Sequence, residues 1–359
     1  MQKIELKDKY ILVTGAAGFI GASLVLRMLG EDDNMHIIGI DNMNDYYDVK
    51  IKEYRLGLIE EAVKASSSDF NFIKGSIADR DMINELFKKY PFAVVVNLAA
   101  QAGVRYSLIN PDAYIETNIT GFYNILEACR HSYDNGAPGV EHLVYASSSS
   151  IYGSSPDIPY KVEAKTDEPV SLYAATKKAD ELIAHSYSKL YSIPSTGLRF
   201  FTVYGPAGRP DMAYFGFTDT LVKGGKIKIF NNGNCLRDFT YVDDVTEGVL
   251  RVMKAAPEKK NGEDGLPVPP YALYNIGNSS PVGLMDFVHI LSEELKTAGV
   301  LTEDFDINAH EELLPMQPGD VAVTYADTSA LERDHGYKPS TDLRTGLRRF
   351  ASWYREFYG

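Results

Sequence analysis

The chain has 359 residues, 45% hydrophobic and 24% charged, a composition typical of a globular protein with room for about two domains of roughly 150 residues each. Its formal net charge of -13 disfavours non-specific binding to nucleic acid or to an anionic membrane surface, so we expect neither as a partner. Residues 1–12 lack a signal-peptide pattern, and no apolar run approaches the roughly 20 residues of a membrane span, which together predict a cytoplasmic protein.

Short β-branched runs alternate with longer helical segments from the start of the chain. Strands are predicted over residues 10–15, 36–41, 70–76, 93–100, 142–148 and 196–200, and helices over residues 19–29, 81–90, 111–132 and 172–191. Several of these strands are apolar on both faces, which is typical of a buried parallel sheet. The βαβ series therefore predicts an α/β fold with a doubly wound parallel sheet, the Rossmann arrangement.

The pattern becomes irregular after about Gly205, where turns rich in Gly, Pro and Asn begin. We expect a smaller mixed C-terminal domain there, and we predict a surface loop over residues 257–270, one more sheet strand over residues 271–277, and helices over residues 284–296 and 343–358. The expected division is residues 1–202 with 238–277 as the nucleotide-binding domain, and residues 203–237 with 278–359 as the substrate-binding domain.

Three glycines mark the passage from the first predicted strand to the first helix. Gly15 permits a tight turn, Gly18 lets the backbone approach a pyrophosphate, and Gly21 allows close packing of the helix whose N-terminus faces the phosphates. Asp41 closes the second strand and can accept hydrogen bonds from both ribose hydroxyls, whereas it would repel a 2′-phosphate. These residues predict NAD rather than NADP as the cofactor.

Tyr173 and Lys177 lie four apart on a predicted helix, so their side chains share one face. An ammonium ion beside a phenol favours the phenolate, the form that acts as a general base. Four serines, residues 147–150, leave the strand 142–148 at its carboxyl end, where open α/β sheets place ligands. The residues alone do not single out one serine, but an activated tyrosine and a glycine turn in one chain indicate hydride chemistry on an alcohol.

Cysteine and histidine usage indicates neither a disulfide nor a metal site. Cys129 and Cys235 are far apart and have no CxxC spacing, so both are predicted to be packing thiols. The seven histidines are scattered without the spacing of metal ligands, and no metal is expected.

Longer motifs spread over almost the whole chain, at residues 97–105, 200–206, 237–244 and 316–320. Together with the glycine turn, the serine run and the Tyr173–Lys177 pair, they resemble the nucleotide-sugar branch of the extended short-chain dehydrogenase/reductases, and within it the UDP-glucuronate 4-epimerases. The resemblance implies reversible C4 epimerisation of UDP-glucuronate to UDP-galacturonate through a 4-keto sugar, with tightly bound NAD. It also implies a homodimer whose seam is formed by helices 111–132 and 172–191.

The resemblance assigns roles to individual residues. It makes Tyr173 the base, Ser148 the catalytic hydroxyl and Lys177 the residue that holds the nicotinamide ribose. It implies NAD contacts for Gly15, Gly18, Phe19, Ile20, Gly21, Asp41, Ser76, Ile77, Leu98, Ala99, Ala100, Tyr173 and Lys177. It implies substrate contacts for Ser148, Tyr173, Ser149, Ser150, Thr202 and Arg209, the last four around the sugar carboxylate, and for Phe230 at the uracil and Arg237 at the pyrophosphate.

Three positions depart from the pattern of the branch. Ser76 stands where relatives often have an acid, Ala207 where a tryptophan is common, and Gln317 where galactose-type epimerases have an arginine. With Gln317 in that place, Arg237 is expected to carry more of the diphosphate charge.

A 4-keto uronate is a β-keto acid, which loses carbon dioxide when the bond to the carboxyl group stands perpendicular to the carbonyl plane. A bidentate arginine fork suits a carboxylate, so Arg209 is expected to hold that group near the plane. A UDP-glucuronate decarboxylase would instead orient the carboxylate for loss, and a neutral UDP-hexose 4-epimerase would gain little from Arg209. A dehydratase needs an acid pair where Ser149 and Ser150 stand, and a non-enzymatic NAD sensor would not need the catalytic residues.

Overall fold

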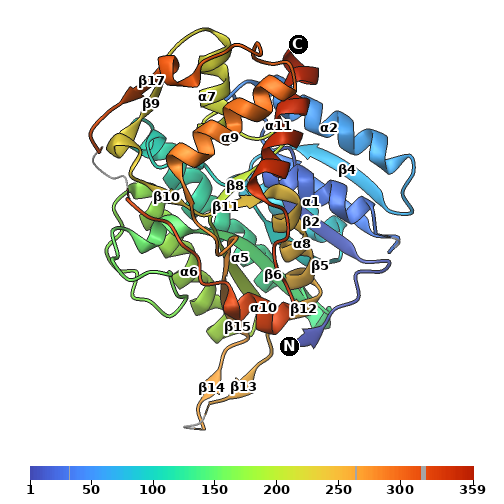
Figure 1. The fold of residues 1–359 in the computed structure, drawn as a ribbon. Coiled ribbons are helices and arrows are strands. Elements are labelled where there is room, and N and C mark those ends of the chain that lie inside the picture. Colours follow the sequence, from blue (N-terminus) through green and yellow to red (C-terminus); the bar gives the residue numbers. More distant parts are fainter. Residues whose placement is uncertain (32, 263–264, 317–320) are drawn as a thin grey trace.

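A computed structural model of the protein describes residues 1–31, 33–262, 265–316 and 321–359, and its centre is a seven-stranded sheet (Figure 1). Every neighbouring pair of strands in this sheet is parallel, which confirms the predicted doubly wound α/β fold. From edge to edge the strands are β15 (Tyr271–Ile276), β7 (Ser195–Phe200), β6 (His142–Ser148), β5 (Phe92–Asn97), β2 (Tyr10–Thr14), β3 (His36–Asp41) and β4 (Asp69–Lys74).

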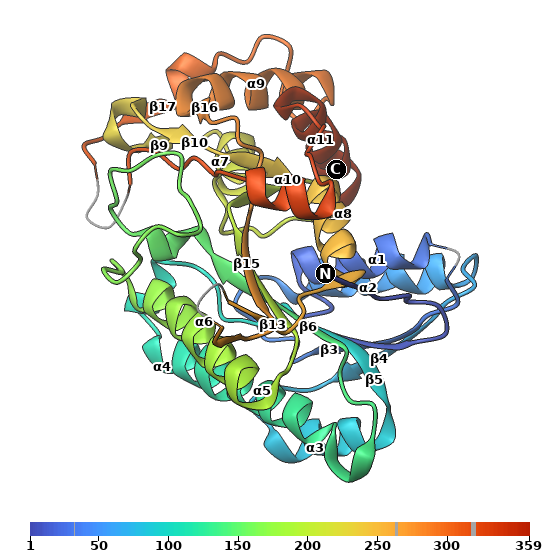
Figure 2. The same cartoon turned by 90° about the horizontal axis from the view of Figure 1, so that it is seen from below.

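Helices cover both faces of the sheet (Figure 2). On one face lie α1 (Phe19–Leu29), α2 (Val49–Val63) and α8 (Val242–Met253), and on the other lie α3 (Arg80–Lys89), α5 (Phe122–His131) and α6 (Leu172–Tyr191). Alternate residues of the central strands enter separate apolar clusters, Val13 and Val96 on the first face, Leu12 and Val95 on the second. This two-sided burial explains why β2 and β5 carry apolar residues on both faces.

The predicted helix over residues 111–132 is present but not uniform. It consists of α4 (Pro111–Tyr114), a π-helical segment η2 (Ile115–Gly121) and then α5. Asn118 within the π-helical segment accepts a hydrogen bond from Gln101 N at 2.8 Å and donates to Gln101 O at 3.1 Å and to Thr176 Oγ1 at 3.0 Å. The wider turns thus tie the loop after β5 to α6, in keeping with the frequent use of π-bulges at functional sites.

Helix α2 was not predicted, because its buried face carries charge. Its inward residues are Ile51, Lys52, Arg55 and Ile59. Arg55 is 2% exposed, and it donates to three backbone carbonyl oxygens, those of Ala17 at 2.9 Å, Ala207 at 2.8 Å and Gly208 at 3.0 Å. One buried guanidinium therefore joins the glycine turn after β2 to the loop that leads to Arg209.

The C-terminal part combines short strand pairs with helices. The strands β8 (Thr202–Tyr204) and β11 (Phe239–Tyr241) are parallel, as are β9 (Ile227–Ile229) and β17 (Glu311–Leu313), whereas β10 (Leu236–Arg237) and β16 (Val282–Gly283) are antiparallel. Helices α9 (Leu284–Thr297) and α11 (Leu343–Tyr358) form where they were predicted, and α7 (Ala213–Val222) and α10 (Ser329–His335) were not predicted. The N-terminal β1 (Gln2–Lys3) pairs with β12 (Ala255–Ala256).

The surface loop predicted over residues 257–270 is wrong in part. Within it, β13 (Lys260–Asn261) and β14 (Pro267–Val268) pair antiparallel and project from the body of the molecule (Figure 1). Gly262 N donates to Leu266 O at 2.8 Å, and Gly265 has φ of 77°. The acidic, proline-rich stretch that indicated a loop thus contains a short strand pair.

Candidate active site

One cavity of about 1300 Å³ opens at the carboxyl ends of the sheet strands. This is the edge at which open α/β sheets bind ligands. All residues predicted to contact cofactor or substrate line it: Gly15, Gly18, Phe19, Ile20, Gly21, Asp41, Ser76, Ile77, Leu98, Ala99, Ala100, Ser148, Ser149, Ser150, Tyr173, Lys177, Thr202, Arg209, Phe230 and Arg237. Gln317 and residues 318–320 of the motif at 316–320 lie outside the described residues.

The glycine turn forms a cradle that side chains would fill. Gly15 has φ of 70°, a conformation that favours glycine, and a Cβ there would lie 2.9 Å from Ala99 N. A Cβ on Gly21 would lie 2.1 Å from Gly15 O, so only glycine lets α1 start this close to the turn. The turn, the start of α1 at Phe19 and the carboxylate of Asp41 at the end of β3 together fit a dinucleotide such as NAD.

A buried lysine, Lys52, accompanies Asp41, and the sequence analysis did not identify it. Lys52 Nζ lies 3.3 Å from Asp41 Oδ1 and donates to Asn44 Oδ1 at 2.9 Å, and the Lys52 and Asp41 side chains are 5% and 7% exposed. All three residues line the cavity. The local sequence gave no signal, because Lys52 reaches Asp41 from the unpredicted helix α2.

The serine run makes a tight turn at the end of β6. Ser148 is 8% exposed, and its Oγ accepts from Ser150 N at 3.2 Å and from Ser150 Oγ at 2.9 Å. Ser149 and Ser150 begin the 3-10 turn η4 (Ser149–Tyr152). Ser147 instead points into the protein, where it donates to Glu181 Oε1 at 2.7 Å. All four serines line the cavity, but the Ser147 hydroxyl is engaged by Glu181, whereas those of Ser148 and Ser150 bond to each other.

Tyr173 and Lys177 lie in the first turns of α6, whose N-cap Ser171 accepts from Ala174 N at 3.1 Å. The Tyr173 ring meets Tyr114 edge to face at 6.0 Å. Lys177 is 2% exposed, and its Nζ donates to Ala146 O at 3.0 Å and to Asp180 Oδ2 at 3.1 Å. Since an ammonium carries three protons, one remains for a cofactor or the tyrosine.

Asp180 is a buried acid that the sequence analysis missed. Burial raises the pKa of Asp180 to about 6, despite the opposing effect of Lys177. Its Oδ1 is buried and has no hydrogen-bond partner among the described residues. The fixed position of Lys177 is therefore maintained by a carboxyl group that is itself incompletely satisfied.

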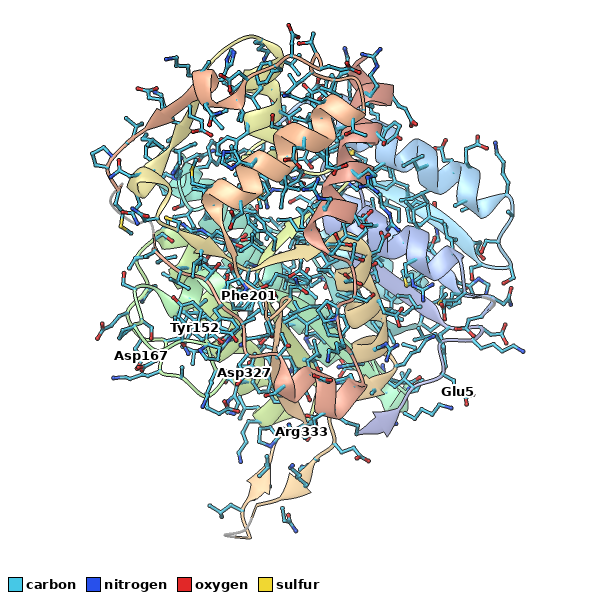
Figure 3. The ribbon with its side chains drawn as sticks, in the orientation of Figure 1. Glu5, Tyr152, Asp167, Phe201, Asp327 and Arg333 are labelled. Atoms are coloured by element: carbon cyan, nitrogen blue, oxygen red, sulfur yellow. The ribbon has the colours of Figure 1, made fainter. Side chains whose placement is uncertain are left out.

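A second buried ion pair supports the serine turn from below. Arg199 and Glu181 are 2% and 3% exposed and form a bidentate pair, with Nε to Oε1 at 2.8 Å and Nη2 to Oε2 at 2.9 Å. Arg199 Nη1 also donates to Tyr152 OH at 2.9 Å. The Tyr152 ring lies 6.4 Å from Phe201 in a small apolar cluster (Figure 3). This network fixes the ends of β6 and β7 beneath the cavity.

Arg209 lies on the loop after β8 and is already paired. Its Nε donates to Asp211 Oδ1 at 3.0 Å and its Nη2 to Asp211 Oδ2 at 2.6 Å. Ala207 in the same loop has φ of 50° and is 8% exposed, and its carbonyl is held by Arg55. Nothing in the structure explains why an alanine rather than a larger side chain stands there.

The remaining predicted substrate residues, Thr202, Phe230 and Arg237, also line the cavity. Phe230 begins η5 (Phe230–Gly233), and the Arg105 guanidinium lies 5.3 Å from the centre of its ring. Arg237 Nη1 donates to Leu236 O at 3.0 Å and to Ala322 O at 3.1 Å. A cavity lined by this aromatic ring and by the two arginines suits a planar base and a diphosphate.

Cys129 and Cys235 are both free and buried. Over the described ranges, no three His, Cys, Asp or Glu side chains gather as a metal site would require. Within the same ranges, no helix is long and apolar enough to cross a membrane.

Comparison with known proteins identifies relatives across nearly the whole chain. The sequence pattern described as the NAD dependent epimerase/dehydratase family matches residues 11–277. UDP-glucuronate 4-epimerase 4 of Arabidopsis thaliana is 46% identical over 354 residues, 97% of this chain and 76% of that protein. Protein CapI of Staphylococcus aureus is also 46% identical, covering 97% of this chain and 99% of that protein.

A solved structure shows the same arrangement. The crystal structure of UDP-glucuronic acid 4-epimerase from Bacillus cereus, in complex with UDP-glucuronic acid and NAD, is 29% identical in sequence. It superimposes with a TM-score of 0.80 over 97% of this chain and 100% of that chain.

Proposed function

Because the chain belongs to the NAD dependent epimerase/dehydratase family, we propose that it is an NAD-dependent UDP-glucuronate 4-epimerase, which interconverts UDP-glucuronate and UDP-galacturonate. The observation that carries the proposal is that Tyr173, Lys177, Ser148 and Arg209 line the same cavity as the glycine cradle. A base, a dinucleotide site and a cation for a carboxylate thus share one space.

The chain's own residues move a proton and hold the sugar. Tyr173, as the phenolate, takes the proton of the C4 hydroxyl and later returns it, while Ser148 hydrogen-bonds the same oxygen. Lys177, one turn further along α6, uses its remaining N–H on the nicotinamide ribose. When bound, NAD supplies the redox chemistry, oxidising C4 to a ketone and then reducing it. If the sugar turns its other face before the reduction, the configuration at C4 is inverted.

The cofactor is held by the residues of the cradle and the adjoining loops. Gly15, Gly18, Phe19, Ile20 and Gly21 receive the pyrophosphate, and Asp41, next to Lys52, receives the adenosine ribose. Ser76 and Ile77 meet the adenine, and Leu98, Ala99 and Ala100 line the cleft beside the nicotinamide. Their common position along one cavity supports these assignments.

The substrate occupies the other end of the cavity. Phe230 stacks on the uracil, Arg237 binds the diphosphate, and Ser149, Ser150, Thr202 and Arg209 surround the carboxylate. Arg209 has a second edge, formed by Nη1 and Nη2, beyond the one that binds Asp211, and this edge serves the substrate. A carboxylate held there favours the epimerase over a decarboxylase or a neutral UDP-hexose epimerase.

The test is to incubate the purified protein with UDP-glucuronate alone and identify the products. We expect UDP-galacturonate without added NAD, and loss of turnover by at least about 10²-fold in Tyr173→Phe, because the variant lacks the general base. Tyr358→Phe, an exposed tyrosine at the end of α11 outside the cavity, is the matched control and should remain active. A UDP-pentose as the main product would show a decarboxylase, and no product at all would contradict the proposal.

The wider organisation follows from the same assignment. Residues 1–202 with 238–277 hold the NAD, and residues 203–237 with 278–359 hold the UDP-sugar, with the parallel pair β8 and β11 linking the two parts. The enzyme works in the cytoplasm as a homodimer. Exposed apolar side chains on the outer helices, including Tyr123, Leu182 and Leu190, support such a seam. Sedimentation of only a 39.8 kDa species would exclude the dimer.

A further inference from the structure

The pairing of Arg209 with Asp211 leaves the arginine in a defined orientation. Asp211 takes the Nε–Nη2 edge of the guanidinium in a bidentate contact at 3.0 Å and 2.6 Å. The side chains of Arg209 and Asp211 are 25% and 28% exposed, so the surrounding protein covers the pair in part. A planar guanidinium fixed along one edge can present only its Nη1–Nη2 edge to a ligand.

Asp211 is itself held from the cofactor side of the cavity. Tyr46, in the loop between β3 and α2, donates its hydroxyl to Asp211 Oδ2 at 3.2 Å. The Tyr46 ring packs on Tyr106 at 4.6 Å, and a Cβ on Gly103 would lie 2.8 Å from the Tyr46 hydroxyl. Tyr46 therefore has little freedom to move away from Asp211.

The electrostatics of this chain agree with its geometry. Burial acts to raise the pKa of Asp211, but the Arg209 charge and the hydrogen bonds from Arg209 and Tyr46 outweigh it and lower that pKa. Burial and the neighbouring Asp211 raise the pKa of Tyr46 to about 12, so its hydroxyl remains a donor. Burial acts to lower the pKa of Arg209, but the charge and hydrogen bond of Asp211, with a smaller contribution from Tyr173, outweigh it and raise that pKa.

We infer that Asp211 is a positioning residue, held by Tyr46, that aims the free edge of Arg209 at the carboxylate of the substrate and so sets the preference for a uronate. The inference rests on the proposed function, because it needs a uronate in the cavity. The chain Tyr46–Asp211–Arg209 connects the loop after β3 with the loop after β8.

The same orientation protects the 4-keto uronate. In the unwanted reaction the bond between C5 and the carboxyl carbon breaks, carbon dioxide leaves, and the electron pair passes to C5 and the C4 ketone as an enolate. Protonation of the enolate at C5 then gives a nucleotide 4-ketopentose. An Arg209 that is fixed on two atoms holds the carboxylate near the ketone plane, whereas an Arg209 that rotates does not.

The first experiment measures binding without turnover. In the NAD-loaded Tyr173→Phe protein, calorimetry gives the ratio of the dissociation constants for UDP-glucose and UDP-glucuronate. Adding Asp211→Asn should lower this preference by about tenfold or more, because an amide N–H faces the guanidinium and the arginine loses its orientation. Adding Tyr46→Phe should lower it less and in the same direction. Affinity for UDP-glucose should stay the same in both.

The second experiment measures leakage with Tyr173 intact. Carbon dioxide released from UDP-glucuronate isotopically labelled at the carboxyl group should rise, relative to epimerised product, in Asp211→Asn and in Tyr46→Phe. Asp157→Asn is the matched control, because Asp157 is an exposed aspartate outside the cavity whose carboxylate has no hydrogen bond within the described ranges.

The outcomes separate the inference from the function on which it rests. A wild-type protein that does not interconvert the two uronates would overturn both. The wild-type protein could be active while Asp211→Asn and Tyr46→Phe both keep its binding preference and release no more carbon dioxide than Asp157→Asn. That result would overturn the inference alone. If a variant lowers the affinity for UDP-glucose and UDP-glucuronate equally, the residue has a merely structural role, and this result would also overturn the inference.

Discussion

The buried pair between Glu181 and Arg199 gives a prediction about stability. In Glu181→Gln, an amide NH₂ group replaces one carboxylate oxygen. This group and the Arg199 guanidinium are both hydrogen-bond donors, so they cannot pair. In the wild-type protein the Glu181 carboxylate accepts three hydrogen bonds, from Ser147 Oγ at 2.7 Å and from Arg199 at 2.8 Å and 2.9 Å. Both charged side chains are at most 3% exposed. Removing one partner of such a pair leaves a buried charge, so we expect a loss of about 3–5 kcal/mol of unfolding free energy.

Equilibrium unfolding in urea, followed by circular dichroism, measures this loss. Glu61→Gln is the matched control, because Glu61 pairs with Lys64 on the surface, where the side chains are 72% and 68% exposed and such a pair contributes at most about 1 kcal/mol. A Glu181→Gln midpoint that coincides with that of Glu61→Gln would show that the buried pair is not what holds β6 and β7 together.

Two further predictions concern α6 and the glycine cradle. Burial raises the pKa of Asp180 from 3.8 to about 6, so the folded protein binds a proton at this carboxyl more tightly than the unfolded chain does. The resulting contribution to the unfolding free energy is complete below about pH 4 and is lost as the pH rises through 6. The unfolding free energy of Asp180→Asn should therefore rise relative to wild type by up to about 3 kcal/mol between pH 4 and pH 7, and a constant difference in urea unfolding would refute the reasoning. Gly21→Ala places a Cβ 2.1 Å from Gly15 O, so NAD retained after dialysis should fall about tenfold or more, whereas Gly57→Ala, with nothing within 4 Å of its Cβ, should retain it.

The sheet was predictable because each strand is recognisable from the apolar residues within its own short segment. Strands such as β3 (His36–Asp41) and β6 (His142–Ser148) are apolar on both faces, and the helices that follow β2 and precede β7 have clear boundaries. The same locality explains why the glycine turn and the Tyr173–Lys177 pair were found. Each depends only on the spacing of residues that are close together in the sequence.

Features that depend on distant partners were not predictable. Helix α2 was missed because Lys52 and Arg55 occupy its inner face, and a charged residue is assigned to the surface unless its partner is known. Those partners, Asp41 and the carbonyls of Ala207 and Gly208, are 11 to 153 residues away. The inferred role of Asp211 could not be predicted either, since it depends on the contact with Tyr46, 165 residues earlier in the chain.

Arg55 has a consequence for anyone who wishes to re-engineer the enzyme for another sugar. A transplanted recognition loop must still offer carbonyl oxygens where Ala207 and Gly208 now present them, or the guanidinium of α2 is stranded in the interior. Loop grafts that ignore this requirement should fail in the dinucleotide half of the molecule, because Arg55 also braces Ala17. Donor loops are therefore best chosen by their backbone path at these two positions before their side chains are considered.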